Sequence, residues 1–115
     1  MTTKIYHNPR CSKSRQTMAL LEEQSIDAQV VEYLKTPPNA DELQEILNLL
    51  QMKPRELMRR KEAVYKELNL DDDALSDAQL IQAMVNNPIL IERPIVVANG
   101  KAAIGRPPEQ VLELF

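Results

Sequence analysis

The strand–helix–strand order at the start of the chain constrains its fold most. Residues 2–6 (TTKIY) are largely β-branched or aromatic and run into the turn residues His7-Asn8-Pro9, which predicts a short strand. Residues 12–24 are good helix formers and predict a helix. Residues 28–34 (AQVVEYL) predict a second strand, which the prolines of Thr36-Pro37-Pro38 end. Such a unit favours two parallel strands joined by a right-handed crossover.

The middle of the chain, residues 39–87, contains no convincing strand and predicts an insert of three to four helices. Asn39 with Glu42, and Ser76 with Gln79, have the spacing of capping boxes. The apolar residues that follow each cap recur at helical spacing and predict the buried faces. These residues are Leu43, Ile46, Leu47 and Leu50 after the first cap, and Leu80, Ile81, Met84 and Val85 after the second. Between them, residues 55–68 predict a helix with a break.

Strand patterns return near the end of the chain. Asn99-Gly100 separates Ile95-Val96-Val97 from residues 101–104, which is a strong hairpin signal. A last helix is expected to start with Gly105-Arg106-Pro107-Pro108 and to have Val111, Leu112 and Phe115 on its inner side. The order β-α-β, helical insert, β-β-α predicts an α/β fold with a mixed sheet, and 115 residues are enough for a single domain, 1–115.

Charge and hydropathy exclude several classes of protein. The 14 Lys and Arg residues against 17 Asp and Glu residues give a net charge of −3, whereas a nucleic-acid-binding protein is expected to be basic. No apolar run approaches the roughly 18 residues of a membrane helix, and the first residues lack the apolar region of a signal peptide. We therefore expect a cytoplasmic monomer that binds neither nucleic acid nor membrane.

Cys11, the one cysteine, lies directly before the first predicted helix. Unpaired N–H groups and the helix dipole stabilise an anion there, and thiols in this setting ionise more readily than free cysteine. The alternative is a buried structural cysteine. The polar neighbours Arg10, Ser12 and Lys13 favour the reactive thiolate. A single cysteine also excludes an internal disulfide and a multi-cysteine metal site, and we expect no metal.

The same loop is suited to binding an oxyanion, because successive backbone N–H groups from Arg10 to about Ser14 can point into one concavity. We assign Ser12, Ser14 and Arg15 to this anion site. The loop contains no glycine, so dinucleotide and Walker motifs are absent. His7 is either a turn residue that bonds to backbone or a group that tunes Cys11, and the residues alone leave both open.

Arginines follow or precede the ends of predicted elements, and their guanidinium groups match tetrahedral oxyanions. Arg93 precedes Pro94 and Arg106 precedes Pro107, whereas spacing cannot choose between Arg59 and Arg60. Only about 5–6% of X–Pro bonds are cis, so this base rate predicts a trans bond at Pro94.

Several segments in combination resemble the glutaredoxin-coupled arsenate reductase family, over nearly the whole chain. They are His7 to Arg15 (HNPRCSKSR), Tyr33-Leu34, Pro37-Pro38, Arg55 to Arg59 (RELMR), Asn87 to Val97 (NPILIERPIVV) and Gly105-Arg106-Pro107. The resemblance implies a thioredoxin-like fold with a helical insert and a cis peptide bond at Pro94. It also implies that Cys11 is the nucleophile and that His7 tunes it. Arg59, Arg93 and Arg106 are then the arsenate ligands, which selects Arg59 over Arg60.

The implied reaction is the reduction of arsenate to arsenite through a Cys11 thioarsenate adduct. Because the chain has no second cysteine, the electrons must come from outside, with glutathione as co-substrate, glutaredoxin as partner and no bound cofactor. Family members with arsenate chemistry usually carry Gly-Thr where this chain has Ser12-Lys13. Two alternatives stay open: a glutathione-dependent thiol-disulfide reductase, and an Spx-type regulator that binds RNA polymerase, although Ser14 replaces the second cysteine of that group.

Overall fold

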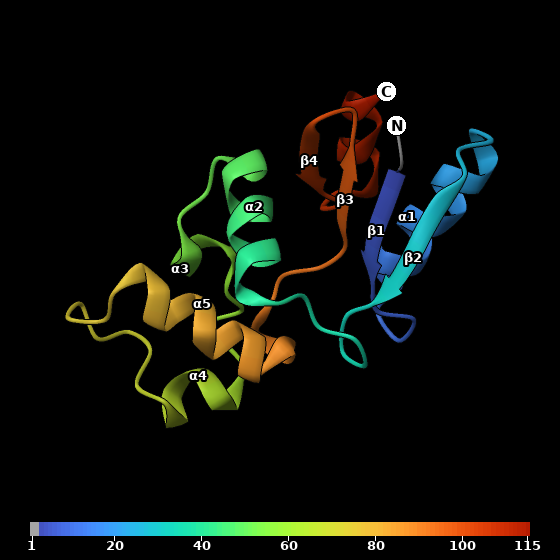
Figure 1. The fold of residues 1–115 in the computed structure, drawn as a ribbon. Coiled ribbons are helices and arrows are strands. Elements are labelled where there is room, and N and C mark those ends of the chain that lie inside the picture. The colour runs from blue at the N-terminus through green and yellow to red at the C-terminus, as the bar shows by residue number, and fades with distance from the viewer. Residues whose placement is uncertain (1–2) are drawn as a thin grey trace. The chain divides into compact units, whose positions relative to one another are not determined.

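The computed structural model describes residues 3–115, so Thr2 of the predicted first strand lies outside the described residues. The strands and helices follow the predicted order (Figure 1). The strands are β1 (Thr3–His7), β2 (Ala28–Glu32), β3 (Ile95–Ala98) and β4 (Lys101–Ile104). The α-helices are α1 (Ser12–Glu23), α2 (Ala40–Leu50), α3 (Pro54–Leu57), α4 (Ala63–Glu67) and α5 (Asp77–Asn86). Two 3-10 helices complete the chain, η1 (Pro88–Leu90) and η2 (Pro108–Leu114).

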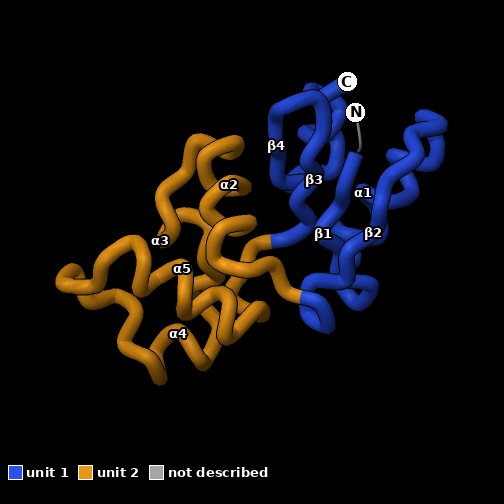
Figure 2. The backbone as a smooth tube through the Cα atoms, viewed as in Figure 1, with its two compact units in different colours: residues 1–36, 93–115 blue, residues 37–92 orange. Residues whose placement is uncertain are grey.

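These elements form two compact units (Figure 2). Unit 1 combines the chain up to residue 36 with residues 93–115, and it holds all four strands, α1 and η2. Unit 2 is Pro37–Glu92, which holds α2 to α5 and η1. The helical stretch predicted over residues 39–87 falls within unit 2.

The sheet of unit 1 has the strand order β2-β1-β3-β4 (Figure 1). In it, β1 runs parallel to β2 and antiparallel to β3, and β3 runs antiparallel to β4. Helices α1 and η2 pack against each other and bury one core with the sheet. The buried members of this core are Ile5, Leu21, Val96, Ala98, Val111 and Leu114. The predicted α/β fold with a mixed sheet is confirmed.

The β3–β4 hairpin turns where the sequence predicts it. Asn99 and Gly100 have φ values of 54° and 73°, the left-handed conformation at both central positions that matches the twist of the flanking strands.

The prediction for the last helix is partly wrong. Helix η2 is a 3-10 helix with three residues per turn, so Val111 and Leu114 face inward. Phe115, in contrast, is 49% exposed.

The second strand also ends earlier than predicted, at Glu32 rather than at residue 34. The N–H groups of Lys35 and Thr36 both donate to the carbonyl oxygen of Glu32, at 2.9 Å, which closes a turn directly after the strand. Tyr33 is buried in that turn and Leu34 is 42% exposed.

In unit 2 both predicted capping boxes are present. The Asn39 side chain accepts from the Glu42 N–H at 2.8 Å while the Glu42 carboxylate accepts from the Asn39 N–H at 3.1 Å, and Ser76 and Gln79 form the same reciprocal pair.

The predicted buried faces of α2 and α5 are confirmed except at their last positions. Leu43, Ile46 and Leu47 are buried in α2, and Leu80, Ile81 and Met84 in α5, whereas Leu50 and Val85 are half-buried.

The predicted break between residues 55 and 68 separates α3 from α4, and a long-range contact explains it. Met58 has extended backbone angles and forms an isolated antiparallel bridge with Ile91. The Arg59 N–H donates to the Leu90 carbonyl oxygen at 2.7 Å, and the Glu92 N–H donates to the Leu57 carbonyl oxygen at 2.9 Å. These bonds hold Met58 and Arg59 outside helical geometry, directly after the end of α3.

Candidate active site

Cys11 occupies the N-cap position of α1, directly after the turn that follows β1. Its N–H donates to the Asn8 carbonyl oxygen at 3.0 Å, and its own carbonyl oxygen accepts from the Arg15 N–H at 3.0 Å. The residue has extended backbone angles and is 8% exposed. The sulfur therefore lies at the end of the helix where N–H groups lack intrahelical partners.

The surroundings of the Cys11 sulfur favour its anion. Burial alone raises the pKa of the thiol, but the backbone N–H groups of Ser14 and Lys13 and the charges of Arg93 and Arg106 lower it, and their combined effect prevails. The pKa of Cys11 is thus below its ordinary value of 9.0. A structural cysteine among aliphatic side chains would have a raised pKa, so this environment favours the reactive thiolate.

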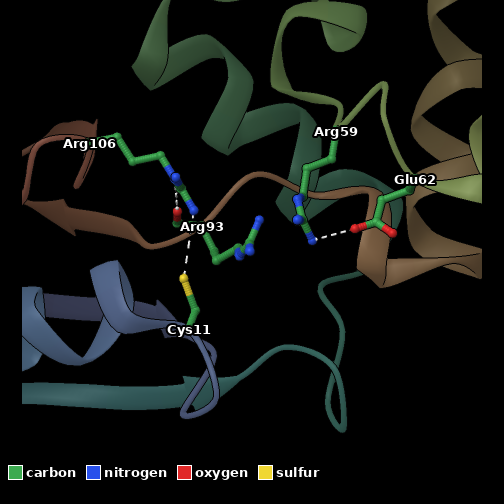
Figure 3. A network of polar contacts seen from close by, with 5 residues as sticks. All are labelled: Cys11, Arg59, Glu62, Arg93 and Arg106. Atoms are coloured by element: carbon green, nitrogen blue, oxygen red, sulfur yellow. Dashed lines mark hydrogen bonds and ion pairs between the residues drawn. The ribbon is translucent and has the colours of Figure 1, made fainter.

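Two arginines of unit 1 act on the sulfur, and Arg106 reaches it directly (Figure 3). Arg106 places Nη2 3.6 Å from the Cys11 Sγ, and its Nε donates to the Arg93 carbonyl oxygen at 2.8 Å. The Arg93 charge acts on the same thiol. Both arginines precede cis peptide bonds, Arg93–Pro94 and Arg106–Pro107. The cis bond that the family resemblance implies at Pro94 is confirmed, and the trans bond expected there from base rates is wrong. The cis bond at Pro107 had no signal in the sequence.

Gly105 lets the chain that carries Arg106 lie close to α1. A Cβ atom at this position would be 2.5 Å from Thr17 Oγ1 and 2.8 Å from Pro94 Cγ, which is closer than van der Waals contact. The Gly105 N–H also donates to the Pro94 carbonyl oxygen at 2.9 Å. Sequence reasoning placed Gly105 only within a family motif; its close approach to Thr17 depends on the tertiary fold.

His7 and Ser14 form a buried pair on the other side of the loop. His7 Nδ1 lies 2.6 Å from Ser14 Oγ, and the Asn8 N–H donates to the same oxygen at 3.0 Å. Ser14 is fully buried and His7 is 9% exposed. The hydroxyl of Ser14, predicted to bind substrate, is therefore engaged within the protein, while its N–H acts on the sulfur.

The other two residues assigned to the anion site are at the surface. Ser12 and Arg15 are both exposed in the first turn of α1. Arg15 donates from Nη1 to the Pro9 carbonyl oxygen at 2.9 Å, which ties the helix to the preceding turn.

Arg59 belongs to unit 2, where it forms an ion pair with Glu62 (Figure 3). The Nη1 to Oε1 distance is 2.8 Å, and both side chains are 25% exposed. Sequence reasoning missed Glu62, because Arg59 and Glu62 lie in the segment between α3 and α4, where their pairing depends on the break that separates these helices. Arg60, the alternative to Arg59, is exposed.

A metal centre and a membrane span find no support in the described part of the chain. Among residues 3–115, no three His, Cys, Asp or Glu side chains gather as metal ligands. Within the same residues, no helix is both long and apolar enough to cross a bilayer.

Comparison with known proteins places this site in a family. The model of the ArsC family matches residues 6–114. The chain is 65% identical over 112 residues to YfgD, an uncharacterized protein of Escherichia coli (strain K12), covering 96% of this chain and 94% of that protein. It is 54% identical over 109 residues to an arsenate reductase of Neisseria meningitidis (serogroup A), covering 94% and 93%.

A solved structure agrees with these matches. The arsenate reductase from Vibrio cholerae is 57% identical, superposes with a TM-score of 0.97, and the match covers 100% of this chain and 98% of that one. The thioredoxin-like fold predicted from the family resemblance is confirmed with it. Because the family model matches nearly the whole chain and these relatives are more than half identical to it, the chain belongs to the ArsC family.

Proposed function

We propose that this protein reduces arsenate to arsenite, with Cys11 as the nucleophile. The observation that carries the proposal is the guanidinium of Arg106 at 3.6 Å from the Cys11 sulfur, at a helix start whose N–H groups favour the thiolate. A thiolate is the nucleophilic form of cysteine, and arginine forks match tetrahedral oxyanions. Relatives named arsenate reductases, 50–54% identical to this chain, support the choice of arsenate.

In the first step, the Cys11 thiolate attacks the arsenic of arsenate. A sulfur–arsenic bond forms, and the bond from arsenic to one hydroxyl of arsenate breaks as that hydroxyl takes up a proton and leaves as water. Arsenic is still As(V) in this adduct. Arg93 and Arg106 stabilise the negative oxygens around the sulfur, and the N–H groups of the loop provide further donors.

In the second step, a glutathione thiolate attacks the Cys11 sulfur. The electron pair of the sulfur–arsenic bond stays on arsenic, which leaves as arsenite, As(III), and a mixed disulfide remains on Cys11. Two thiols have then supplied the two electrons. A third thiol, from glutaredoxin or a second glutathione, must attack the glutathione sulfur to release the Cys11 thiolate, because the chain has no second cysteine.

Arg59 is proposed as a further arsenate ligand on the family resemblance. The matched test compares Arg59→Ala with Arg60→Ala, which removes the same charge from the neighbouring residue. We expect only Arg59→Ala to raise the KM for arsenate. Equal effects of the two substitutions would refute the assignment.

A coupled assay tests the proposal as a whole. Purified protein with arsenate, reduced glutathione, glutaredoxin and an NADPH-recycling system should consume NADPH, and Cys11→Ser should abolish the consumption. Omission of glutaredoxin tests its role as the reductant. NADPH consumption with a small mixed disulfide but none with arsenate would instead identify a thiol-disulfide reductase and refute the proposal.

A further inference from the structure

A small cavity lies beside the loop that leads into Cys11. It sits beyond the carboxyl ends of the parallel strands β1 and β2, the usual place for ligands in α/β sheets. Its volume is about 260 Å³, close to the lower limit of small-molecule sites. Its walls belong to unit 1 and include Asn8, Pro9, Arg10, Glu32, Leu34 and Lys35.

The cavity combines charges of both signs with an apolar wall. Arg10 and Lys35 are exposed cations, and Glu32 supplies a half-buried carboxylate. Lys35 Nζ lies 3.7 Å from Glu32 Oε1, with the two side chains 78% and 43% exposed. An ion pair this loose and exposed contributes little to stability, and both groups can turn to a ligand. Pro9 and Leu34 provide the apolar surface.

These groups match the head of a free α-amino acid, which carries an α-carboxylate and an α-ammonium on one carbon. Arg10 and Lys35 can bind the carboxylate, and Glu32 can bind the ammonium. A simple oxyanion would be repelled by Glu32, and a purely apolar ligand would strip water from three charges without replacing it. The cavity therefore favours a zwitterionic ligand with a short aliphatic chain.

Glutathione, the thiol of the second reaction step, has such a head group. Its glutamyl residue is linked through the side-chain carboxyl, so the α-carboxylate and the α-ammonium stay free. This link places the head group about two residue lengths, roughly 7 Å, from the cysteinyl Cα. Arg10 directly precedes Cys11, so the cavity wall and the reactive residue are about 3.8 Å apart between Cα atoms. A peptide held by its glutamyl end is therefore long enough to bring its thiol to the Cys11 sulfur.

We propose that this cavity binds the γ-glutamyl end of glutathione and brings its thiol to Cys11, with Arg10 and Lys35 on the α-carboxylate and Glu32 on the α-ammonium. Arg93 and Arg106 are not among the residues that line it, so glutathione and the oxyanion on Cys11 have separate ligands. The inference rests on the proposed function, in which glutathione attacks the Cys11 sulfur of the thioarsenate adduct.

The first test measures binding without any reaction. S-Methylglutathione keeps both ends of the peptide but has no thiol, and the amide shifts of isotope-labelled protein report where it binds. We expect shifts concentrated at residues 8–10 and 32–35. Arg10→Gln and Lys35→Gln should each raise the Kd about two- to fivefold, the range of exposed charge pairs. Lys101→Gln, which removes the same charge from an exposed residue of β4, is the matched control and should change nothing.

Glu32→Gln separates a specific site from the general attraction of an anion. The substitution makes the cavity more positive, so nonspecific attraction of the anionic peptide predicts tighter binding. The proposal predicts binding about two- to fivefold weaker, because the α-ammonium loses its partner. Tighter binding to Glu32→Gln would overturn the proposal.

A deaminated ligand tests the same contact from the other side. S-Methyl-N-glutarylcysteinylglycine lacks the α-ammonium and keeps the carboxylate. The wild type should bind it about two- to fivefold more weakly than S-methylglutathione, whereas Glu32→Gln should bind the two ligands equally well. An unchanged preference in Glu32→Gln would contradict the contact between Glu32 and the ammonium.

Absence of shifts at the cavity of the wild type would also overturn the proposal, as would equal effects of Lys35→Gln and Lys101→Gln. None of these measurements uses arsenate or a reaction of Cys11. A failed arsenate assay therefore leaves the binding result readable, and a failed binding test leaves the proposed reaction standing.

Discussion

Replacement of Arg106 by glutamine should make the Cys11 thiol harder to ionise. The substitution removes the positive charge whose Nη2 lies 3.6 Å from the sulfur, while it keeps a polar, uncharged side chain at this position. A unit charge favours the thiolate over the thiol, so its loss raises the pKa of Cys11.

The magnitude follows from Coulomb's law. Arg106 is exposed, so the dielectric constant of water is the appropriate choice rather than that of a protein interior. At the observed 3.6 Å separation the interaction is then about 1 kcal/mol, or roughly fivefold in the ionisation constant of the thiol. Added salt should reduce the difference between variant and wild type.

The assay is the rate of alkylation of the single cysteine by iodoacetamide as a function of pH. The matched control is Lys101→Gln, which removes the same charge from an exposed residue of β4. We expect the midpoint of Arg106→Gln to lie higher than that of the wild type, and that of Lys101→Gln to be unchanged. Equal midpoints in the two variants would refute the argument that Arg106 acts on Cys11 by proximity.

Three further predictions concern stability. Gly105→Ala should lower the free energy of unfolding by about 1–3 kcal/mol, because the added methyl group overpacks the contact with α1; urea denaturation measures it, and no destabilisation would contradict the close approach. The free energy of unfolding should fall as pH decreases below 6.5, because the unfolded chain protonates His7 before the folded chain does, and His7→Asn should remove this part of the pH dependence. Asn39→Ala should cost about 1 kcal/mol through the lost cap of α2, with the exposed Asp73→Ala as control; identical urea midpoints for the two variants would exclude a capping role.

Local signals explain which parts of the fold could be predicted. The capping boxes at Asn39 and Ser76 and the turn at Asn99-Gly100 each depend on residues a few positions apart, and all three are present. The position of Cys11 at the start of α1 has the same local origin, since the turn before it and the helix formers after it are adjacent in sequence.

Features that depend on distant residues could not be derived in this way. Arg106 and Cys11 are 95 positions apart, and only the pairing of β3 with β1 and β4 brings their segments together. The break after α3 depends on the bridge between Met58 and Ile91, which no local pattern indicates. Phe115 was expected to be buried because an α-helix was assumed, whereas the last helix has 3-10 geometry.

The most direct test of the central claim is the mass of the intact protein after incubation with reduced glutathione, with and without arsenate, in the absence of glutaredoxin. The account predicts that a glutathione adduct forms on the wild type only when arsenate is present, and that Cys11→Ser forms none. If the wild type gained the adduct equally with and without arsenate, or if Cys11→Ser gained it as well, Cys11 would not be the residue that carries electrons to arsenate.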